Sequence, residues 1–203
     1  MPPFKIIMRN ERGNTLTEIL VCVAIGAMIV SASVPNIASM AAKGKVRAAT
    51  RNIAAVFKQA RWEAVAKGKY IGIEFKKAED RYVYRKYEDG NGNGIRKADI
   101  ESGKDVLLSG PYQLKNRYGH VDFSILQAGS IRNIPPATGF IEDADDPIKF
   151  GKSNIASFSP AGESSSGTVY ISDEKDNMMA VVLFGPTVRV RVWEYVHEEN
   201  KWR

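Results

Sequence analysis

The stretch GNTLTE, residues 13–18, lies between a short basic leader and an apolar run without charge from Ile19 to Ala42. The basic residues of the leader are Lys5, Arg9 and Arg12. A lone carboxylate at bilayer depth costs roughly 2.5 to 3.5 kcal/mol on insertion scales, so Glu18 needs a charged partner or a shallow position. The stretch therefore predicts a membrane segment with a functional carboxylate at its start.

Residues 13–18 resemble the N-terminus of type IV prepilins, in which a Gly ends a basic leader and is followed by Phe-Thr-Leu-Ile-Glu and an apolar helix. The matching positions are Gly13, Thr15, Leu16 and Glu18. Asn14 stands where the family usually has Phe, and Thr17 where it usually has an aliphatic residue. The resemblance implies that a prepilin peptidase cleaves after Gly13 and that Asn14, the first mature residue, is N-methylated.

The resemblance also implies assembly roles for Glu18 and Pro35. If the new amine of Asn14 is charged inside a lipid-like bundle, a carboxylate from a neighbouring subunit offsets it. In the family this Glu aligns an incoming subunit with the filament base, and Glu18 takes that role by position. Pro35 stands where pilins carry a helix-bending proline, and it loosens the helix locally because it removes a backbone donor.

Two other interpretations of the N-terminus stay open. One is a secretory signal, with Ile19–Val30 as its apolar region and residues 31–33 as its small-residue cleavage site. The other is a plain signal anchor with an incidental carboxylate. The prepilin interpretation is favoured because an apolar signal core should exclude Glu18, and because an amphipathic pattern continues beyond Pro35.

Composition restricts the remainder of the chain. With 203 residues, of which 44% are hydrophobic and 26% charged, the chain suits one membrane helix and one compact domain with its own core. A net charge of +6 is mild and by itself demands no nucleic acid. Cys22 is the only cysteine, which excludes intrachain disulfides and cysteine-based metal sites.

The residues from 14 to 67 favour one long helix in two parts. At ~1.5 Å per residue, Ile19 to Ala42 covers ~36 Å, enough for a hydrocarbon core of ~30 Å. Beyond Pro35 the apolar residues become one-sided, which indicates an amphipathic helix. Its apolar positions are Val46, Ala49, Ile53, Phe57, Ala60 and Ala64. Residues 67–69, Lys-Gly-Lys, supply a stop signal.

After Gly68 the chain is rich in strand-forming residues with turn residues at short intervals. The predicted strands are 70–75, 82–87, 106–108, 121–126, 155–159, 168–172, 180–184 and 188–195. The expected fold class is α+β, with a long N-terminal helix packed on a mostly antiparallel β domain, as in pilins. The expected divisions are a leader at 1–13, a transmembrane or filament-core helix at 14–42, its amphipathic continuation at 43–67 and a β-rich domain at 68–203.

The C-terminal half resembles the minor pseudopilin family called GspH/FimT. The residues that carry this resemblance are the turn at 159–162, the strand that follows at Thr168 and the closing Val-Arg-Val-Arg strand. The resemblance implies a structural subunit of a type IV pilus or type II secretion pseudopilus. Its implied location is the bacterial inner membrane, single-pass with a periplasmic domain, and then the filament. Its implied partners are other pilin or pseudopilin subunits, the peptidase, the inner-membrane assembly platform and the lipid bilayer.

Residues 89–94, DGNGNG, match the first half of a calcium loop, in which oxygens at alternate positions surround a hard cation. The second half fails, because Ile100 stands where the bidentate Glu is expected. The candidate ligands are Asp89, Asn91, Asn93, Asp99 and Glu101. A simple Asn/Gly surface turn explains the same residues without calcium, and no other cofactor is expected.

Arg189 and Arg191 alternate with valines, which places both guanidinium groups on one face of a strand. Some FimT-like pilins bind DNA through a C-terminal Gly-Arg-x-Arg segment, and Arg189-Val190-Arg191 resembles its second half. A solvated strand face competes with this interpretation, and Glu194, Glu198 and Glu199 are expected to weaken contacts with phosphates.

The sequence predicts no enzyme. The only histidines, His120 and His197, lack metal-like spacing, and the acidic run at 142–146 fits a solvated turn. The function predicted here is that of a minor pilin or pseudopilin. The alternative is a membrane-anchored periplasmic binding module, including a DNA-binding minor pilin for DNA uptake.

Overall fold

The computed structural model describes residues 14–79, 81–127 and 129–203, without the side chains at positions 14 and 32–36. The chain divides into two compact units, Met1–Ala41 and Ala42–Arg203. Helix α1 (Asn14–Lys67) contributes to both of them. We describe each unit by itself.

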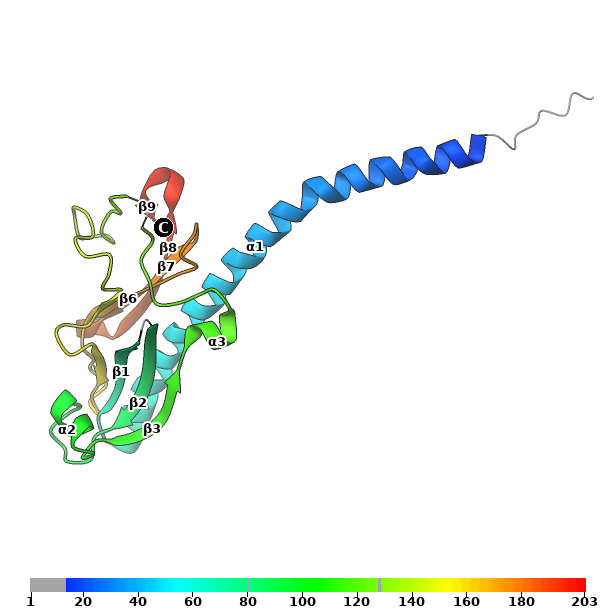
Figure 1. The fold of residues 1–203 in the computed structure, drawn as a ribbon. Coiled ribbons are helices and arrows are strands. Elements are labelled where there is room, and N and C mark those ends of the chain that lie inside the picture. The colour runs from blue at the N-terminus through cyan, green and yellow to red at the C-terminus, as the bar shows by residue number, and fades with distance from the viewer. Residues whose placement is uncertain (1–13, 80, 128) are drawn as a thin grey trace, which may run out of the picture. The chain divides into compact units, whose positions relative to one another are not determined.

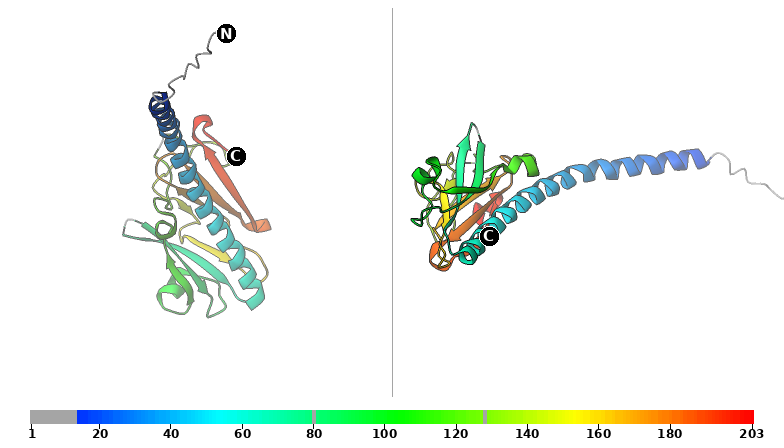
Figure 2. Two further views of the ribbon diagram at one scale, coloured as in Figure 1. Left: turned by 90° about the vertical axis from the view of Figure 1, so that its right-hand side faces the viewer. Right: turned by 90° about the horizontal axis from the view of Figure 1, so that it is seen from below.

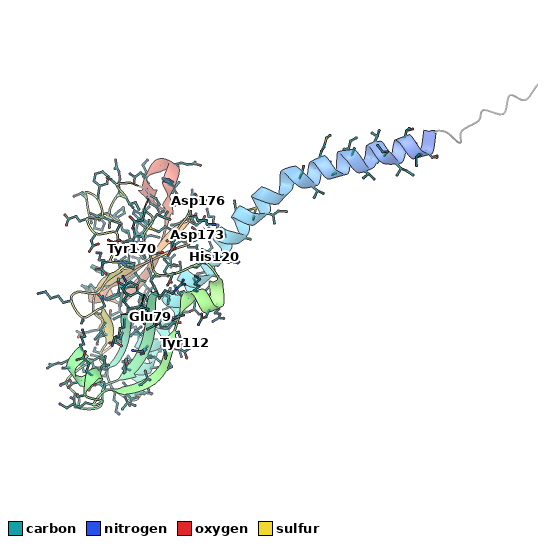
Figure 3. The ribbon with its side chains drawn as sticks, viewed as in Figure 1. Glu79, Tyr112, His120, Tyr170, Asp173 and Asp176 are labelled. Atoms are coloured by element: carbon teal, nitrogen blue, oxygen red, sulfur yellow. The ribbon has the colours of Figure 1, made fainter. Side chains whose placement is uncertain are left out.

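In the first unit, α1 exposes every side chain that is described between positions 15 and 31. Figure 3 shows these side chains projecting from the helix on all sides. In the described ranges of the chain, no helix combines the length and the apolar character that crossing a membrane requires.

In the second unit, residues 42–67 of α1 form the predicted amphipathic helix. All six predicted apolar positions, from Val46 to Ala64, are completely buried, which confirms the spacing argument. The helix ends at Lys67, and Gly68 follows with a φ of 65°. Glycine adopts this left-handed conformation without steric cost, so the chain can turn sharply into the first strand.

Two antiparallel sheets complete the second unit (Figure 1). The first has the order β3-β2-β1-β5, and its strands are β1 (Ile71–Ala78), β2 (Arg81–Glu88), β3 (Val106–Tyr112) and β5 (Ile155–Phe158). The second has the order β4-β6-β7-β8-β9, and its strands are β4 (Ile148–Lys149), β6 (Gly167–Ser172), β7 (Met178–Phe184), β8 (Arg189–Val196) and β9 (Lys201–Trp202). Short helices lie between strands, and those that the structure describes are α2 (Lys97–Glu101), α3 (Leu114–Tyr118), η2 (Gly185–Thr187) and η3 (His197–Glu199). These elements confirm the α+β fold class.

The second part of α1 packs against one face of both sheets (Figure 2). Phe57 lies at the centre of this core. Its ring centroid is 6.2 Å from that of Phe75, 5.8 Å from that of Phe150 and 6.1 Å from that of Phe158. A single helical side chain therefore contacts rings that arrive from separate parts of the chain.

The opposite face of the second sheet carries its own apolar cluster. Tyr170, Ala180, Tyr195 and Trp202 are buried there under the segment between β3 and β4, which contributes Ile125 and Leu126 among others. Successive residues of a strand point to opposite faces. Val169 and Ile171 accordingly pack towards α1, while Tyr170 packs away from it.

One predicted strand is wrong. Residues 121–126 form only an isolated bridge between Asp122 and Ser172. Their alternation has another cause, because Val121 and Phe123 fill the core beneath α1, whereas Ile125 and Leu126 fill the cluster on the other face of the sheet. The short β4, β9, α2 and α3 were not predicted. The remaining seven predicted strands coincide with observed ones to within a few residues.

Candidate functional site

Glu18 lies on α1, five positions into the helix when Asn14 is counted first, and its side chain is exposed. Its neighbours at helical spacing are Thr15 and Cys22. Gly13 and the rest of the leader lie outside the described residues, as does the side chain of Asn14. The structure thus places the backbone of the expected mature N-terminus at the start of the helix, one turn before Glu18.

Large apolar side chains surround Glu18 and extend along the same helix. Leu16 is 75% exposed and Met28 is 70% exposed. The other exposed apolar side chains of this part are Ile19, Leu20, Val21, Val23, Ile25, Ile29, Val30, Ile37 and Met40. Soluble monomers rarely expose a contiguous apolar surface of this extent, and such surfaces mark sites of contact with a membrane or with other proteins.

Residues 8–34 match the family model described as the prokaryotic N-terminal methylation motif. The chain therefore has a type IV pilin-like N-terminus. The matched range contains Glu18 and most of the exposed apolar side chains. No curated protein and no solved structure gives a significant match to the chain.

The motif indicates a structural pilin-type protein, a class that is typically non-enzymatic. It also indicates assembly with other pilin subunits and a membrane-anchored chain.

The two histidines of this pilin-like protein are exposed, and His197 stacks on Tyr195 with ring centroids 6.2 Å apart. Figure 3 labels His120, which precedes the segment that leads to the second sheet.

Position 35 lies within α1, which continues through it as α-helix. The side chain of Pro35 lies outside the described residues. Local unwinding at Pro35 stays a prediction.

The loop at 89–94 is organised around Asp89, which is only 3% exposed. Its Oδ1 accepts hydrogen bonds from the N–H groups of Asn91 (2.9 Å) and Gly92 (2.8 Å), and its Oδ2 accepts one from Gly94 (2.7 Å). Gly92 and Gly94 have φ values of 79° and 84°, which only glycine adopts readily. The repeated glycines therefore let the backbone wrap around one carboxylate.

Asp99 and Asp105 complete this loop. Asn93 Nδ2 donates to Asp99 Oδ2 at 3.0 Å, and this hydrogen bond, together with Lys104, holds the pKa of Asp99 below its usual value. Asp105 accepts a hydrogen bond from the N–H of Arg96 at 3.3 Å. Sequence reasoning missed Asp105, because its link to the loop depends on how the chain returns after α2.

The candidate calcium ligands are engaged in hydrogen bonds of the loop or are exposed. Both oxygens of Asp89 accept backbone hydrogen bonds, and Glu101 is exposed. Within the described ranges, no three side chains of His, Cys, Asp or Glu are grouped so that they could hold a metal ion. Calcium binding by this loop stays a prediction.

Replacing Asp89 with alanine is expected to lower the free energy of unfolding by about 1–3 kcal/mol, because three backbone N–H groups lose their acceptor. We expect the same loss in calcium and in chelator. Thermal unfolding of the full chain in both buffers measures it, and Asp176→Ala serves as control because the Asp176 side chain is exposed. A calcium-dependent stabilisation of the wild type that Asp89→Ala removes would instead establish an ion site.

Arg189 and Arg191 are both exposed on β8 and form no ion pair with a residue that the structure describes. They lie on the same face of the strand, as their alternation predicts. Glu194 belongs to the other face, so it does not neutralise them. DNA binding by these arginines stays a prediction.

Glu194 instead ties the end of the chain to α1, a role that the sequence did not reveal. Its carboxylate pairs with Lys43, with Arg47 at 2.9 Å and with Arg203 at 3.6 Å. The hydrogen bond from Lys43, followed by that from Arg47, holds the pKa of Glu194 below its usual value. Arg47 lies 147 positions from Glu194 in the sequence, and Lys43 lies one helical turn before Arg47, so no local signal could have found this link.

Proposed function

We propose that this chain is a minor pilin or pseudopilin of the GspH/FimT type. In this proposal it is a structural subunit of a type IV pilus or of a type II secretion pseudopilus, and prepilin peptidase cleaves it after Gly13. The observation that carries the proposal is the methylation motif at residues 8–34, which continues from residue 14 onto α1, where the described apolar side chains are exposed.

The exposed apolar helix anchors the chain in lipid before assembly. Removing one large apolar side chain from water contributes roughly 1.5–3 kcal/mol, and the described residues of α1 before position 41 include eleven exposed side chains of this kind. Before assembly they would be covered by the lipid of the bacterial inner membrane, with the second unit in the periplasm. Transfer into a filament core replaces lipid contacts by contacts with neighbouring helices, which are selected by packing.

Glu18 provides the specificity that apolar contacts lack. Its carboxylate pairs with the N-terminal amine of a neighbouring subunit, methylated at Asn14, and so sets the axial register between copies. The amine and the carboxylate each offset the cost of burying the other. Pro35 permits the helix to loosen locally during the transfer, and the assembly platform and prepilin peptidase act on the chain before the filament forms.

The first test is mass spectrometry of the N-terminal peptide of the full chain, extracted from membranes of cells with their own processing machinery. We expect the peptide to begin at Asn14, with a methyl group on its amine. A start near Val34 would show a secreted, unanchored domain, and an intact Met1 would show a simple signal anchor. Either of these two results would overturn the proposal.

A further inference from the structure

The solvent-facing side of α1 in the second unit is strongly basic. Between positions 42 and 67 the only carboxylate is Glu63, which pairs with Lys86 at 2.8 Å. We define the basic helix face by its exposed residues at helical spacing, Lys45, Ala48, Arg51, Ala55, Lys58 and Trp62. These positions lie opposite the buried positions from Val46 to Ala64.

The cations of the basic helix face lack partners within the domain. Lys45, Arg51 and Lys58 form no ion pair with any residue in the described ranges, whereas Lys43, Arg47 and Lys67 on the same helix do. Trp62, which is 71% exposed, is the largest apolar side chain at this surface. Trp and Arg are enriched among the residues that contribute most to the free energy of protein–protein binding. An exposed tryptophan on the same helix face as an arginine without a described ion pair therefore indicates a surface that binds another protein.

Residues 142–146 form a surface of opposite charge, which we call the acidic segment. It contains Glu142, Asp143, Asp145 and Asp146. Lys149 pairs with Asp146 at 3.2 Å, and Asp143 Oδ1 accepts a hydrogen bond from the N–H of Asp145. Glu142 and Asp145 are exposed, and their carboxylates form no ion pair or hydrogen bond with a described residue.

The two surfaces lie on opposite sides of the second unit. The helix packs on one face of the second sheet through Val169, Ile171 and Val181. Ile141 and Ala144, within and beside the acidic segment, pack on the cluster that covers the other face. In Figure 1, α1 and the later part of the segment between β3 and β4, which leads into β4, lie accordingly on different sides of the strands β6 and β7. The two surfaces of one copy therefore cannot neutralise each other.

We propose that the basic helix face of one copy docks on the acidic segment of a second copy, in a head-to-tail contact between domains. This inference rests on the proposed filament function. The occupant is a second copy because the complementary charge is present on the same chain, on the side where a head-to-tail neighbour presents it. A contact between two different surfaces does not close on itself and so generates an open helical array.

The contact is small, and its effect depends on repetition. One helix face about 10 Å wide buries less than the roughly 800 Å² per partner of a stable dimer, so isolated domains associate weakly. In a filament the apolar helices already hold neighbouring domains close together. This raises the effective concentration of the two surfaces, so a weak contact between them can form. The charges then fix the orientation of each domain relative to the next.

The test is charge reversal with rescue in the full chain, expressed in cells with the processing machinery. Arg51→Glu with Lys58→Glu removes no described ion pair, and Glu142→Lys with Asp145→Lys removes no described side-chain hydrogen bond. Each pair is expected to reduce copy-to-copy cross-links about tenfold, and the combination of all four substitutions is expected to restore them. The control matched to the acidic-segment variant, Asp176→Lys with Glu198→Lys, makes the same change of charge at exposed positions outside both surfaces, and it is expected to have no effect.

The readout is zero-length carbodiimide cross-linking of intact membranes and sheared filaments. The covalent dimer is isolated, and its linked peptides are identified. We expect Lys45 or Lys58 joined to a carboxylate of the acidic segment. Filaments without this cross-link, or a four-fold variant without rescue, would overturn the contact and leave the filament proposal standing. Lack of rescue would show that the basic helix face serves another anionic partner, such as a lipid surface. A cross-linked dimer without any filament would support the contact and overturn the filament proposal.

Discussion

Glu18→Leu is expected to reduce incorporation into filaments by on the order of 100-fold, while the chain stays in the membrane fraction. Removing one partner of a buried ion pair costs about 3–5 kcal/mol, because the other charge is left buried without compensation. Here that charge is the N-terminal amine of the neighbouring subunit. The apolar helix itself becomes more apolar, so membrane retention is preserved.

The measurement compares the amount of the chain in sheared filaments with the amount in the membrane fraction. Glu18→Gln separates charge from size and is expected to fail almost as completely as Glu18→Leu. Ser31→Leu is the matched control, because it adds an apolar side chain on the same exposed part of α1 without removing a charge. Normal assembly of Glu18→Leu would overturn the role of Glu18 in setting the register between copies.

Phe57→Ala is expected to destabilise the second unit by about 3–5 kcal/mol, the range for loss of a buried phenylalanine with a residual cavity. Phe57 is completely buried and contacts the rings of Phe75 on β1, Phe158 on β5 and Phe150, which directly follows β4. The loss therefore loosens the packing of the helix on the first sheet and on the residue that follows β4.

Denaturant unfolding of the full chain in detergent, followed by tryptophan fluorescence, measures this loss. Val65→Ala is the control on the same helix, because Val65 is 45% exposed, and its cost is expected to stay below about 1 kcal/mol. A cost below 1 kcal/mol for Phe57→Ala as well would contradict the placement of Phe57 at the centre of the core.

The parts of the fold that sequence predicts are those governed by short periodic patterns. The spacing from Val46 to Ala64 predicts a helix face because one helix has only one side to bury. The segment 121–126 fails for the converse reason. This segment passes from the core beneath α1 to the cluster on the other face of the second sheet, and it buries apolar side chains in each of them. The resulting alternation of apolar and polar residues looks like that of a strand.

The residues of the candidate site likewise fall into those that a local sequence pattern identifies and those that only the fold brings together. The residues from Gly13 to Glu18 form a local motif, so the sequence alone identifies the N-terminus. Asp89 is ambiguous, because a turn that binds its own backbone N–H groups uses the same Asp, Asn and Gly residues as a calcium loop. The ion pairs of Glu194 cannot be predicted from the sequence, since they depend on how β8 is placed beside α1 in the folded domain.

Glu194 also has a mechanical consequence for a filament under load. A pull transmitted along the chain enters the second unit at residue 42, and the first described ion pairs between the helix and a sheet that it reaches are those of Lys43 and Arg47 to Glu194. Glu194 lies on β8, which pairs with β7 from Met179↔Glu194 to Phe184↔Arg189. Tension therefore passes from the helix into a hydrogen-bonded sheet, and salt that screens these two ion pairs lowers the force at which the helix is torn from its domain.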